Sequence, residues 1–450
     1  MINRENVKDV LTLALPAVGE MILYMMIWVF DTMMLGKYGG KLAVSAVGLS
    51  SEIIYTFVNI LISTSIAVGV TSLVARRVGA KEYDSAGEYA TLSLVISIGI
   101  ALALSVIFFI FSKEILVAAK ADNSILYLGI IYMKICSIGI FFSMLTTVLN
   151  AVLRGEGNTK TPLIASFIIN LINITLDWLL IFGHFGLPKL GTKGAAIATS
   201  TANFIGFLFI FIYVFKRCKI KPRIKYIKKF NIKKLKELLT LSIPSGLQES
   251  AFSICRLINM VMIMTLGDIA FSANQITTTI ESLSFMPGWG FAVAATTLVG
   301  HKIGEKDYKK AKEYGDTCIF LGMSIMAVCA VLFVLFPNFL ISLFIKKDEI
   351  QVIKLGASCL MIASLEQIPT AISMVVGGAL KGSGDTRRPF LVAFISNWII
   401  RLPLMYYFIY LNKSPVTYVW WITAIQWTFD GSLIFIMYRR KFTNKFSCYH

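Results

Sequence analysis

LTLALPAVGEMILYMMIWVFDTMML, residues 11–35, is the stretch of sequence that decides the fold. Its 25 residues are long enough to cross a bilayer with some tilt, and nearly all of them are apolar. At helical spacing, Glu20, Tyr24, Trp28 and Asp31 lie on one face of the predicted helix. A carboxylate in hydrocarbon costs about 2.5–3.5 kcal/mol even on a lenient insertion scale, so this face should point into the protein. Alternatively, Asp31 lies at the end of the span and reaches the interface.

The composition is typical of a polytopic helical membrane protein. Hydrophobic residues make up 56% of the 450 positions, mean hydropathy is +0.74 and only 15% of residues are charged. A soluble domain would carry about 25% charged residues. The net charge of +18 would suit a nucleic-acid-binding protein, but the charges cluster in short loops, so we expect no nucleic-acid partner. The seven cysteines and three histidines show no spacing typical of a metal site.

Apolar runs predict twelve transmembrane helices in an all-α fold. The predicted spans are 10–35, 44–75, 89–112, 125–152, 162–183, 194–215, 238–266, 271–299, 316–344, 354–380, 389–411 and 416–438. Thirty of the 43 basic residues lie at the termini and in the even-numbered loops, whereas nine, including Lys346 and Lys347, lie in odd-numbered loops. Because positive charge stays cytoplasmic, we expect a multi-pass protein of the cell membrane with both termini inside. The polar N-terminal segment does not resemble a cleaved signal peptide.

The chain repeats itself after about half its length. GVTSLVARRVGAKEYDSAGEYA (69–90) matches AATTLVGHKIGEKDYKKAKEYG (294–315) at nine of 22 positions. LRGEGNTKTPLIASFIIN (153–170) matches LKGSGDTRRPFLVAFISN (380–397) at eight of 18 positions. Two six-helix lobes are therefore predicted, related by a pseudo-twofold axis along the membrane normal and separated by a central cleft. The predicted boundaries are 1–215 for the first lobe, 216–237 for a basic linker and 238–450 for the second lobe.

The repeated loops and the linker have structural interpretations. Gly79 and Gly304 are predicted to allow the turn between the second and third helices of each lobe. Neither glycine-rich repeat has the spacing of a phosphate-binding P-loop. The linker carries eleven basic residues, and it is expected to anchor the topology on anionic membrane lipids; a specific regulatory role is the alternative.

Titratable acid is concentrated in the first lobe. An offset of 228 converts Glu20 into Gln248 and Asp31 into Asn259. In the fifth helix Asp177 shares a face with two asparagines, but its equivalent in the second lobe is Leu404. The neutralised second lobe suggests that the first lobe holds the ion-coupling site.

The predicted coupling residues are Asp31, Asn170, Asn173, Asp177 and Thr199. Two carboxyl groups that face each other in a low dielectric cannot both stay ionised, so they form a plausible proton site. Alternatively, Asp31, Asn173 and Asp177, with the Thr199 hydroxyl, hold Na⁺ through oxygen ligands. The sequence does not choose between these ions, and Asn170 could instead only join helices through hydrogen bonds. No other cofactor is expected.

Further polar and aromatic residues could line a cleft for an organic cation, because Met and aromatic side chains adapt to varied shapes. Packing or lipid-facing positions are the alternative for each of them. This candidate substrate cleft comprises Glu20, Tyr24, Gln248, Glu249, Arg256, Asn259, Gln275, Glu281, Met286 and Trp289.

These motifs resemble the multidrug and toxic compound extrusion (MATE) family, and most closely its DinF-type branch. The resemblance rests on PAVGEMILYMMIWVFDTMMLG (16–36), the paired LRGEGNT and LKGSGDT loops, and the pair Asn173 and Asp177. It implies a monomeric antiporter that exports amphipathic, often cationic small molecules in exchange for H⁺ or Na⁺. It also implies that Asp31, Asn173 and Asp177 couple transport to the ion. The chain departs from the sodium-coupled NorM-type branch, whose tenth-helix acid is replaced here by Thr370.

Two rival functions follow from the same residues. A flippase for lipid-linked sugars, from the same superfamily, would need a strongly basic cavity, but only four basic residues lie in or beside the spans. An intramembrane enzyme is not expected, because no HExxH, GxSxG or similar catalytic motif occurs on any span.

Overall fold

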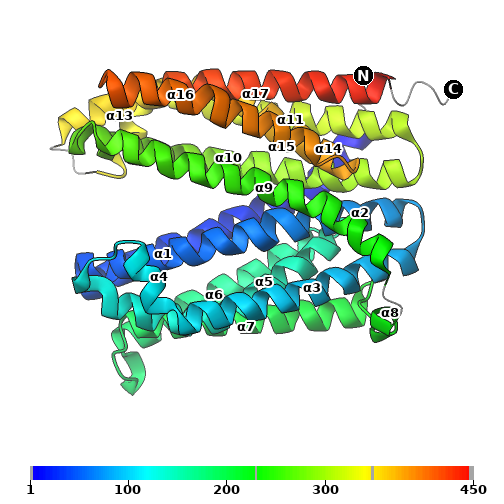
Figure 1. Ribbon diagram of the computed structural model, residues 1–450, viewed down its shortest axis with the longest axis horizontal. Coiled ribbons are helices and arrows are strands. Elements are labelled where there is room, and N and C mark those ends of the chain that lie inside the picture. Colours follow the sequence, from blue (N-terminus) through cyan, green and yellow to red (C-terminus); the bar gives the residue numbers. More distant parts are fainter. Residues whose placement is uncertain (1–3, 229–230, 346–348, 445–450) are drawn as a thin grey trace. The chain divides into compact units, whose positions relative to one another are not determined.

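The computed structural model describes residues 4–228, 231–345 and 349–444, and within these ranges the chain is helical without strands (Figure 1). Lys346 and Lys347, counted above in the odd-numbered loops, lie outside the described residues. In chain order the helices are α1 (Arg4–Val58), η1 (Asn59–Ile66), α2 (Ala67–Gly79), α3 (Tyr83–Ile110), α4 (Ser112–Ala118), α5 (Asn123–Glu156), α6 (Lys160–Phe182), η2 (His184–Gly186), α7 (Thr192–Arg217), α8 (Ile224–Lys228), α9 (Ile232–Met264), α10 (Asp268–Gly304), α11 (Tyr308–Leu335), α12 (Pro337–Ser342), α13 (Ile350–Ala363), η3 (Ser364–Glu366), α14 (Gln367–Gly382), α15 (Arg387–Phe394), η4 (Ile395–Arg401), α16 (Leu402–Met405), η5 (Tyr406–Leu411) and α17 (Thr417–Asn444).

The predicted twelve-helix architecture is confirmed. Ten helical stretches of the described chain are long and apolar enough to span a membrane. Two more helices, α9 with 33 residues and α17 with 28, are long enough but carry more polar residues. Gly40 (φ 56°) breaks α1 into the first span and the beginning of the second.

The turns of the two repeats are built alike, although not at every predicted residue. Gly157 (φ 98°) and Gly384 (φ 82°) take the left-handed conformation in the two glycine-rich loops. The prediction for Gly79 and Gly304 was wrong, because both remain in the helices that they end. Lys81 (φ 59°) and Lys306 (φ 62°) make the turn instead, two residues later.

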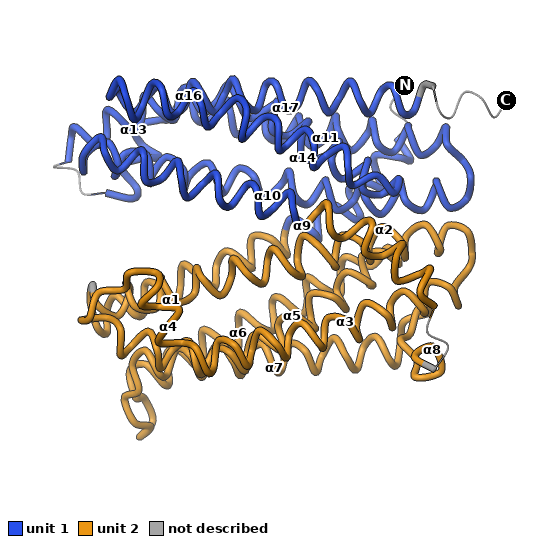
Figure 2. The backbone as a smooth tube through the Cα atoms, viewed as in Figure 1, with its two compact units in different colours: residues 1–18, 247–450 blue, residues 19–246 orange. Residues whose placement is uncertain are grey.

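The chain forms two compact units (Figure 2). Unit 1 comprises residues 1–18 and 247–450, and unit 2 comprises residues 19–246. These bounds differ from the predicted lobes, because the first helix of each half begins in the unit formed mainly by the other half.

Burial explains the difference. Val10 and Ala14 on α1 are fully buried in the apolar core of unit 1, beside Val299 and other residues of α10. Leu238 and Leu241 on α9 are buried in the core of unit 2. The beginnings of α1 and α9 both show apolar residues at helical spacing. This pattern predicts an apolar helix face, but it does not show which of the two cores that face packs against.

Candidate functional site in unit 2

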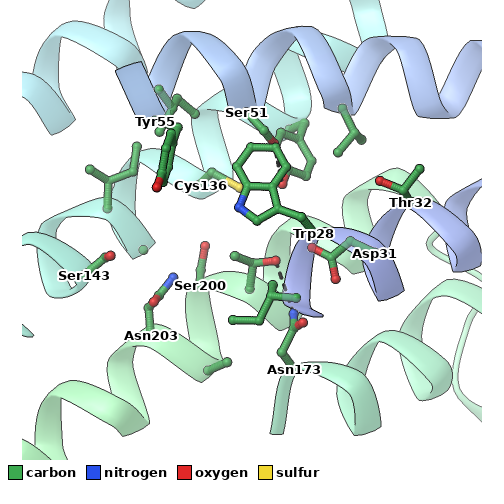
Figure 3. Close-up of a pocket in the computed structure, with 18 of the residues that line it drawn as sticks. Trp28, Asp31, Thr32, Ser51, Tyr55, Cys136, Ser143, Asn173, Ser200 and Asn203 are labelled. Atoms are coloured by element: carbon green, nitrogen blue, oxygen red, sulfur yellow. Dashed lines mark hydrogen bonds between the residues drawn. The ribbon is translucent and has the colours of Figure 1, made fainter. Parts of the chain in front are cut away.

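A cavity of about 150 Å³ lies within unit 2, among α1, α5, α6 and α7 (Figure 3). An apolar cavity of that size accepts a molecule as large as benzene. The polar residues that line it are Tyr24, Trp28, Asp31, Thr32, Ser51, Tyr55, Tyr132, Cys136, Ser143, Asn173, Thr199, Ser200 and Asn203.

The structure brings Asp31 on α1 and Asp177 on α6 together. Their carboxyl groups interact directly with one another, and Asp177 is fully buried. Neither oxygen of Asp177 accepts a hydrogen bond from an N–H or O–H group of the described residues, and Asp31 Oδ1 is likewise unsatisfied. Two carboxylates in contact repel one another, and Asp177 is fully buried while Asp31 is half-buried, so the pair is stabilised by a shared proton or a bound cation.

Asn173 and Thr199 complete this polar cluster. Asn173 Nδ2 donates a hydrogen bond of 3.3 Å to Thr199 Oγ1, and the Asn173 side chain also interacts with Asp177. Asn173 Oδ1 is buried and has no donor among the described residues. The cluster therefore offers a free amide oxygen beside two carboxyl groups, which is a set of oxygen ligands suited to a proton or a hard cation.

Asn170 lies one turn before Asn173 on α6 but does not line the cavity. It is buried, and its Nδ2 donates a hydrogen bond of 2.9 Å to the Ser166 carbonyl on the same helix. The structure therefore separates Asn170 from the residues with which it was grouped.

One wall of the cavity is aromatic. The Trp28 and Tyr55 rings meet edge to face at 5.5 Å, and the Tyr24 and Tyr55 rings lie 5.7 Å apart. Figure 3 shows Trp28 beside Asp31. An aromatic surface next to a carboxyl group is suited to a flat organic cation.

Several lining residues were not predicted from the sequence, including Ser51, Tyr55, Ser143 and Asn203. Ser51 donates a hydrogen bond of 3.1 Å to the Tyr132 hydroxyl, which links the later part of α1 to α5. A signal was present, because Ser51 and Tyr55 are four residues apart on one helical face, as are Thr199 and Asn203.

Glu20 is placed apart from the cavity, although it was grouped with the substrate cleft. It is 5% exposed and forms a hydrogen-bonded ion pair with Arg154, the basic residue of the first glycine-rich loop. Tyr24, by contrast, lines the cavity.

The other candidate cleft residues all lie in unit 1 and do not form one cluster. Asn259 is buried on α9, where its Nδ2 donates to Cys255 Sγ at 3.4 Å. Glu281 on α10 is buried and interacts with the carboxyl group of Glu366. Gln275 and Trp289 are exposed.

Three of the remaining candidates lie on α9 and the fourth on α10. Glu249 interacts electrostatically with Arg256 and with Lys381 on α14. Gln248 is half-buried on α9, and its Oε1 lacks a donor among the described residues. Met286 is half-buried on α10.

Comparisons with known proteins agree with one another over most of the chain. A family model described as MatE matches residues 16–179 and 244–407. The "Probable multidrug resistance protein NorM" of Thermotoga maritima is 32% identical over 399 residues, covering 89% of this chain and 85% of that protein. The "Uncharacterized transporter YisQ" of Bacillus subtilis is 28% identical over 399 residues, 88% of this chain and 86% of that protein.

A solved structure shares the fold. It is titled "Outward-facing conformation of a multidrug resistance MATE family transporter of the MOP superfamily". The two chains superimpose with a TM-score of 0.89 at 21% sequence identity, over 97% of this chain and 96% of that one.

Proposed function

The chain belongs to the MATE family of membrane transporters, and we propose that it exports amphipathic, often cationic small molecules in exchange for H⁺ or Na⁺. It is a transporter and not an enzyme. In this proposal it acts in the cytoplasmic membrane with both termini in the cytoplasm, as the distribution of basic residues indicates.

The contact between Asp31 and Asp177 is the observation that carries the proposal. Asp177 is fully buried and both of its oxygens lack donors among the described residues. Such a pair is destabilising when both groups are ionised, and it becomes stable when it binds one proton or one Na⁺. Binding of the ion at this carboxyl pair would therefore stabilise unit 2.

Coupling requires that ion and substrate compete, or that each prefers a different conformation of the protein. Trp28 and Asp31 are three residues apart on α1 and line the same cavity. A cationic substrate beside Trp28 would favour the ionised form of Asp31, whereas a proton or Na⁺ on the pair would remove that attraction. Binding of the ion would then promote release of the substrate.

Transport in liposomes tests the proposal. The purified protein is reconstituted, a pH gradient or a Na⁺ gradient is imposed separately, and movement of a fluorescent organic cation is followed. Asp31→Asn and Asp177→Asn should each abolish gradient-driven movement while the protein still folds. The matched control is Asp268→Asn, because Asp268 is an exposed residue at the first turn of α10.

Unchanged transport by Asp31→Asn and Asp177→Asn would remove the proposed coupling site. Transport by the wild type under one gradient but not the other identifies the coupling ion. Movement of lipid-linked sugar but no organic cation would support the flippase alternative.

A further inference from the structure

The first helix of each half changes compact unit at an equivalent point. Helix α1 belongs to unit 1 up to residue 18 and to unit 2 from Gly19, and α9 belongs to unit 2 up to Gly246 and to unit 1 from Leu247. The two points are 228 residues apart, the offset that also relates Pro16 to Pro244. Both helices are continuous there, so each one mechanically connects the two units.

Before this point, an acidic residue on each helix accepts a hydrogen bond from a tyrosine hydroxyl of another helix. In unit 1 the Tyr314 hydroxyl on α11 donates a hydrogen bond of 2.6 Å to Asp9 Oδ2. In unit 2 the Tyr89 hydroxyl on α3 donates to Glu237 Oε2. Asp9 and Glu237 are again 228 residues apart, and the two tyrosines occupy equivalent positions of the first sequence repeat.

After this point, an acidic residue on each helix interacts electrostatically with a basic residue of the second sequence repeat. Glu20 on α1 pairs with Arg154 on α5, and the two side chains are only 6% and 15% exposed. Glu249 on α9 interacts with Lys381 on α14, in addition to Arg256 on its own helix. Arg154 and Lys381 are the equivalent basic residues of the LRG and LKG repeats.

The basic residues are held on closely packed helices. A Cβ atom at Gly155 would approach the Thr71 carbonyl oxygen to 3.0 Å, and one at Gly382 would overlap the Thr296 carbonyl oxygen. Thr71 Oγ1 donates to the Ala151 carbonyl at 3.1 Å, and Thr296 Oγ1 donates in the equivalent way to Gly378 at 2.9 Å. Arg154 and Lys381 therefore project from rigid pairs of helices, which makes them firm attachment points.

Charged residues in this position need an explanation beyond packing. Apolar side chains would join the helices at no desolvation cost, whereas a buried ion pair recovers that cost only with good geometry. A similar pairing occurs in both halves, although Glu249 lies one residue after Gln248, the equivalent of Glu20, and Asp31 and Asp177 have no acidic equivalents in the second half. A role shared by both halves is thus separate from ion coupling.

We propose that the pairs Glu20–Arg154 and Glu249–Lys381 are positioning residues that clamp the first helix of each half to its own unit. The inference rests on the proposed transport function, because it concerns the motion between the two access states. In each helix, the segment between the acid–tyrosine hydrogen bond and the acid–base interaction is held at both ends. When one unit moves, this segment must therefore bend. If the acid–base interaction is lost, the segment can take several conformations, so binding of substrate or ion no longer favours a single access state.

Distance measurements between the units test the clamp. Spin labels replace Lys81 and Lys306 in one full-length variant and Lys120 and Lys413 in another, after the seven native cysteines are changed to alanine; all four lysines are exposed. In liposomes, addition of a cationic substrate should shift the wild-type distance distributions. Glu20→Gln should broaden the distributions, suppress the shift and slow export at least about tenfold, because losing one partner of a buried ion pair strongly biases such an equilibrium. Glu249→Gln, at a half-buried residue, should change the distributions and the export rate in the same direction.

The controls separate a clamp from a merely structural contact. Glu114→Gln changes an exposed glutamate on α4 and should behave as the wild type. If Glu20→Gln fails to fold, the exchange of Glu20→Arg with Arg154→Glu restores the attraction and should restore the shift. A normal shift in Glu20→Gln, or a folded exchange variant with no shift, would overturn the inference. If Asp31→Asn also exports normally, the proposed function itself fails; if Asp31→Asn alone is inactive, only the clamp is refuted.

Discussion

Asp31 and Asp177 dominate the chemistry of unit 2 at the scale of single residues, because their carboxyl groups interact and one of them is fully buried. Asp177 has no exposed surface, and Asn173 is its amide neighbour on α6. A carboxyl pair of this kind responds to one proton or one cation, which is the property that a coupled transporter needs. In our proposal, the aromatic wall of the cavity is the binding surface for the organic cation.

Replacing Trp28 tests that wall. Trp28→Ala removes the edge-to-face contact with Tyr55 and should raise the KM for an aromatic cation about two- to tenfold, since such ring contacts contribute about 0.5–1.5 kcal/mol. Trp28→Phe keeps a ring and should retain most of the affinity. Initial rates of export at several substrate concentrations measure both. Equal KM values for wild type and Trp28→Ala would place the substrate elsewhere.

The two acids of the carboxyl pair could be predicted from the sequence, but several residues that line the neighbouring cavity could not. Asp31 and Asp177 stand out because a charge within an apolar span is costly. Ser51 and Ser143 lie in similar spans, yet serine is common in membrane helices as a packing residue and carries no such signal. Glu20 looked like Asp31 in the sequence, and only the structure shows that its partner is Arg154.

At the scale of elements, glycines set how closely the helices approach. A Cβ atom at Gly378 on α14 would overlap the Ala292 carbonyl oxygen of α10, whereas one at the adjacent Gly377 would meet only Ile434 at 3.8 Å. The same helix therefore offers a tight position and an open one next to each other.

Alanine at these two positions should have opposite effects. Gly378→Ala should lower the free energy of unfolding by about 1–3 kcal/mol, because the helices must separate. Gly377→Ala should be neutral or stabilising by up to about 1 kcal/mol through its higher helix propensity. Thermal unfolding in detergent measures both variants, and equal stabilities would contradict the close packing of α10 on α14.

The linker contains the short helix α8, which belongs to unit 2, and hydrogen bonds join the linker to α3. The Tyr226 hydroxyl donates a hydrogen bond of 2.5 Å to Asp84 Oδ1, and the Arg223 N–H donates to Thr91 Oγ1 at 3.0 Å. Burial, together with the Asp84 carboxylate, raises the pKa of Tyr226 to about 12. The phenol is consequently protonated and able to donate at any physiological pH.

Tyr226→Phe tests whether this bond holds the linker. The variant should be cleaved by trypsin within residues 216–236 several-fold faster than the wild type, since the basic linker is then more often detached. Tyr83→Phe, at a nearby exposed tyrosine, is the control. Identical cleavage rates for all three proteins would show that Tyr226 does not restrain α8.

In the wild type, the bond should persist at pH 10 and weaken as the pH rises through about 12, because the raised pKa keeps its donor protonated below that value.

The number and order of the helices were predictable, whereas some details of their ends were not. The apolar segments and the distribution of Lys and Arg follow directly from the residue types, so both can be identified in the sequence. The turns at Lys81 and Lys306 were assigned to the preceding glycines, because glycine has the greater freedom and the sequence does not show how far a helix continues.

At the scale of the whole molecule, the internal repeat predicted two six-helix halves but not the composition of the compact units. Residues 1–18 belong to the unit formed by the second half, and the stretch that begins α9 belongs to the unit formed by the first. An amphipathic helix has the same pattern whichever core it joins, so this exchange has no sequence signature. The proposed antiport requires that ion binding at the carboxyl pair of unit 2 changes the access of substrate to its site.

Ion release on substrate binding tests the central claim most directly. Purified wild-type protein in weakly buffered detergent solution is mixed with a cationic substrate, while a pH indicator and radioactive Na⁺ report which ion leaves. The account predicts release of about one H⁺ or one Na⁺ per molecule bound, and none from a variant that carries both Asp31→Asn and Asp177→Asn. Equal release by the wild type and by this double variant would contradict the claim that the buried carboxyl pair is where the two solutes are exchanged.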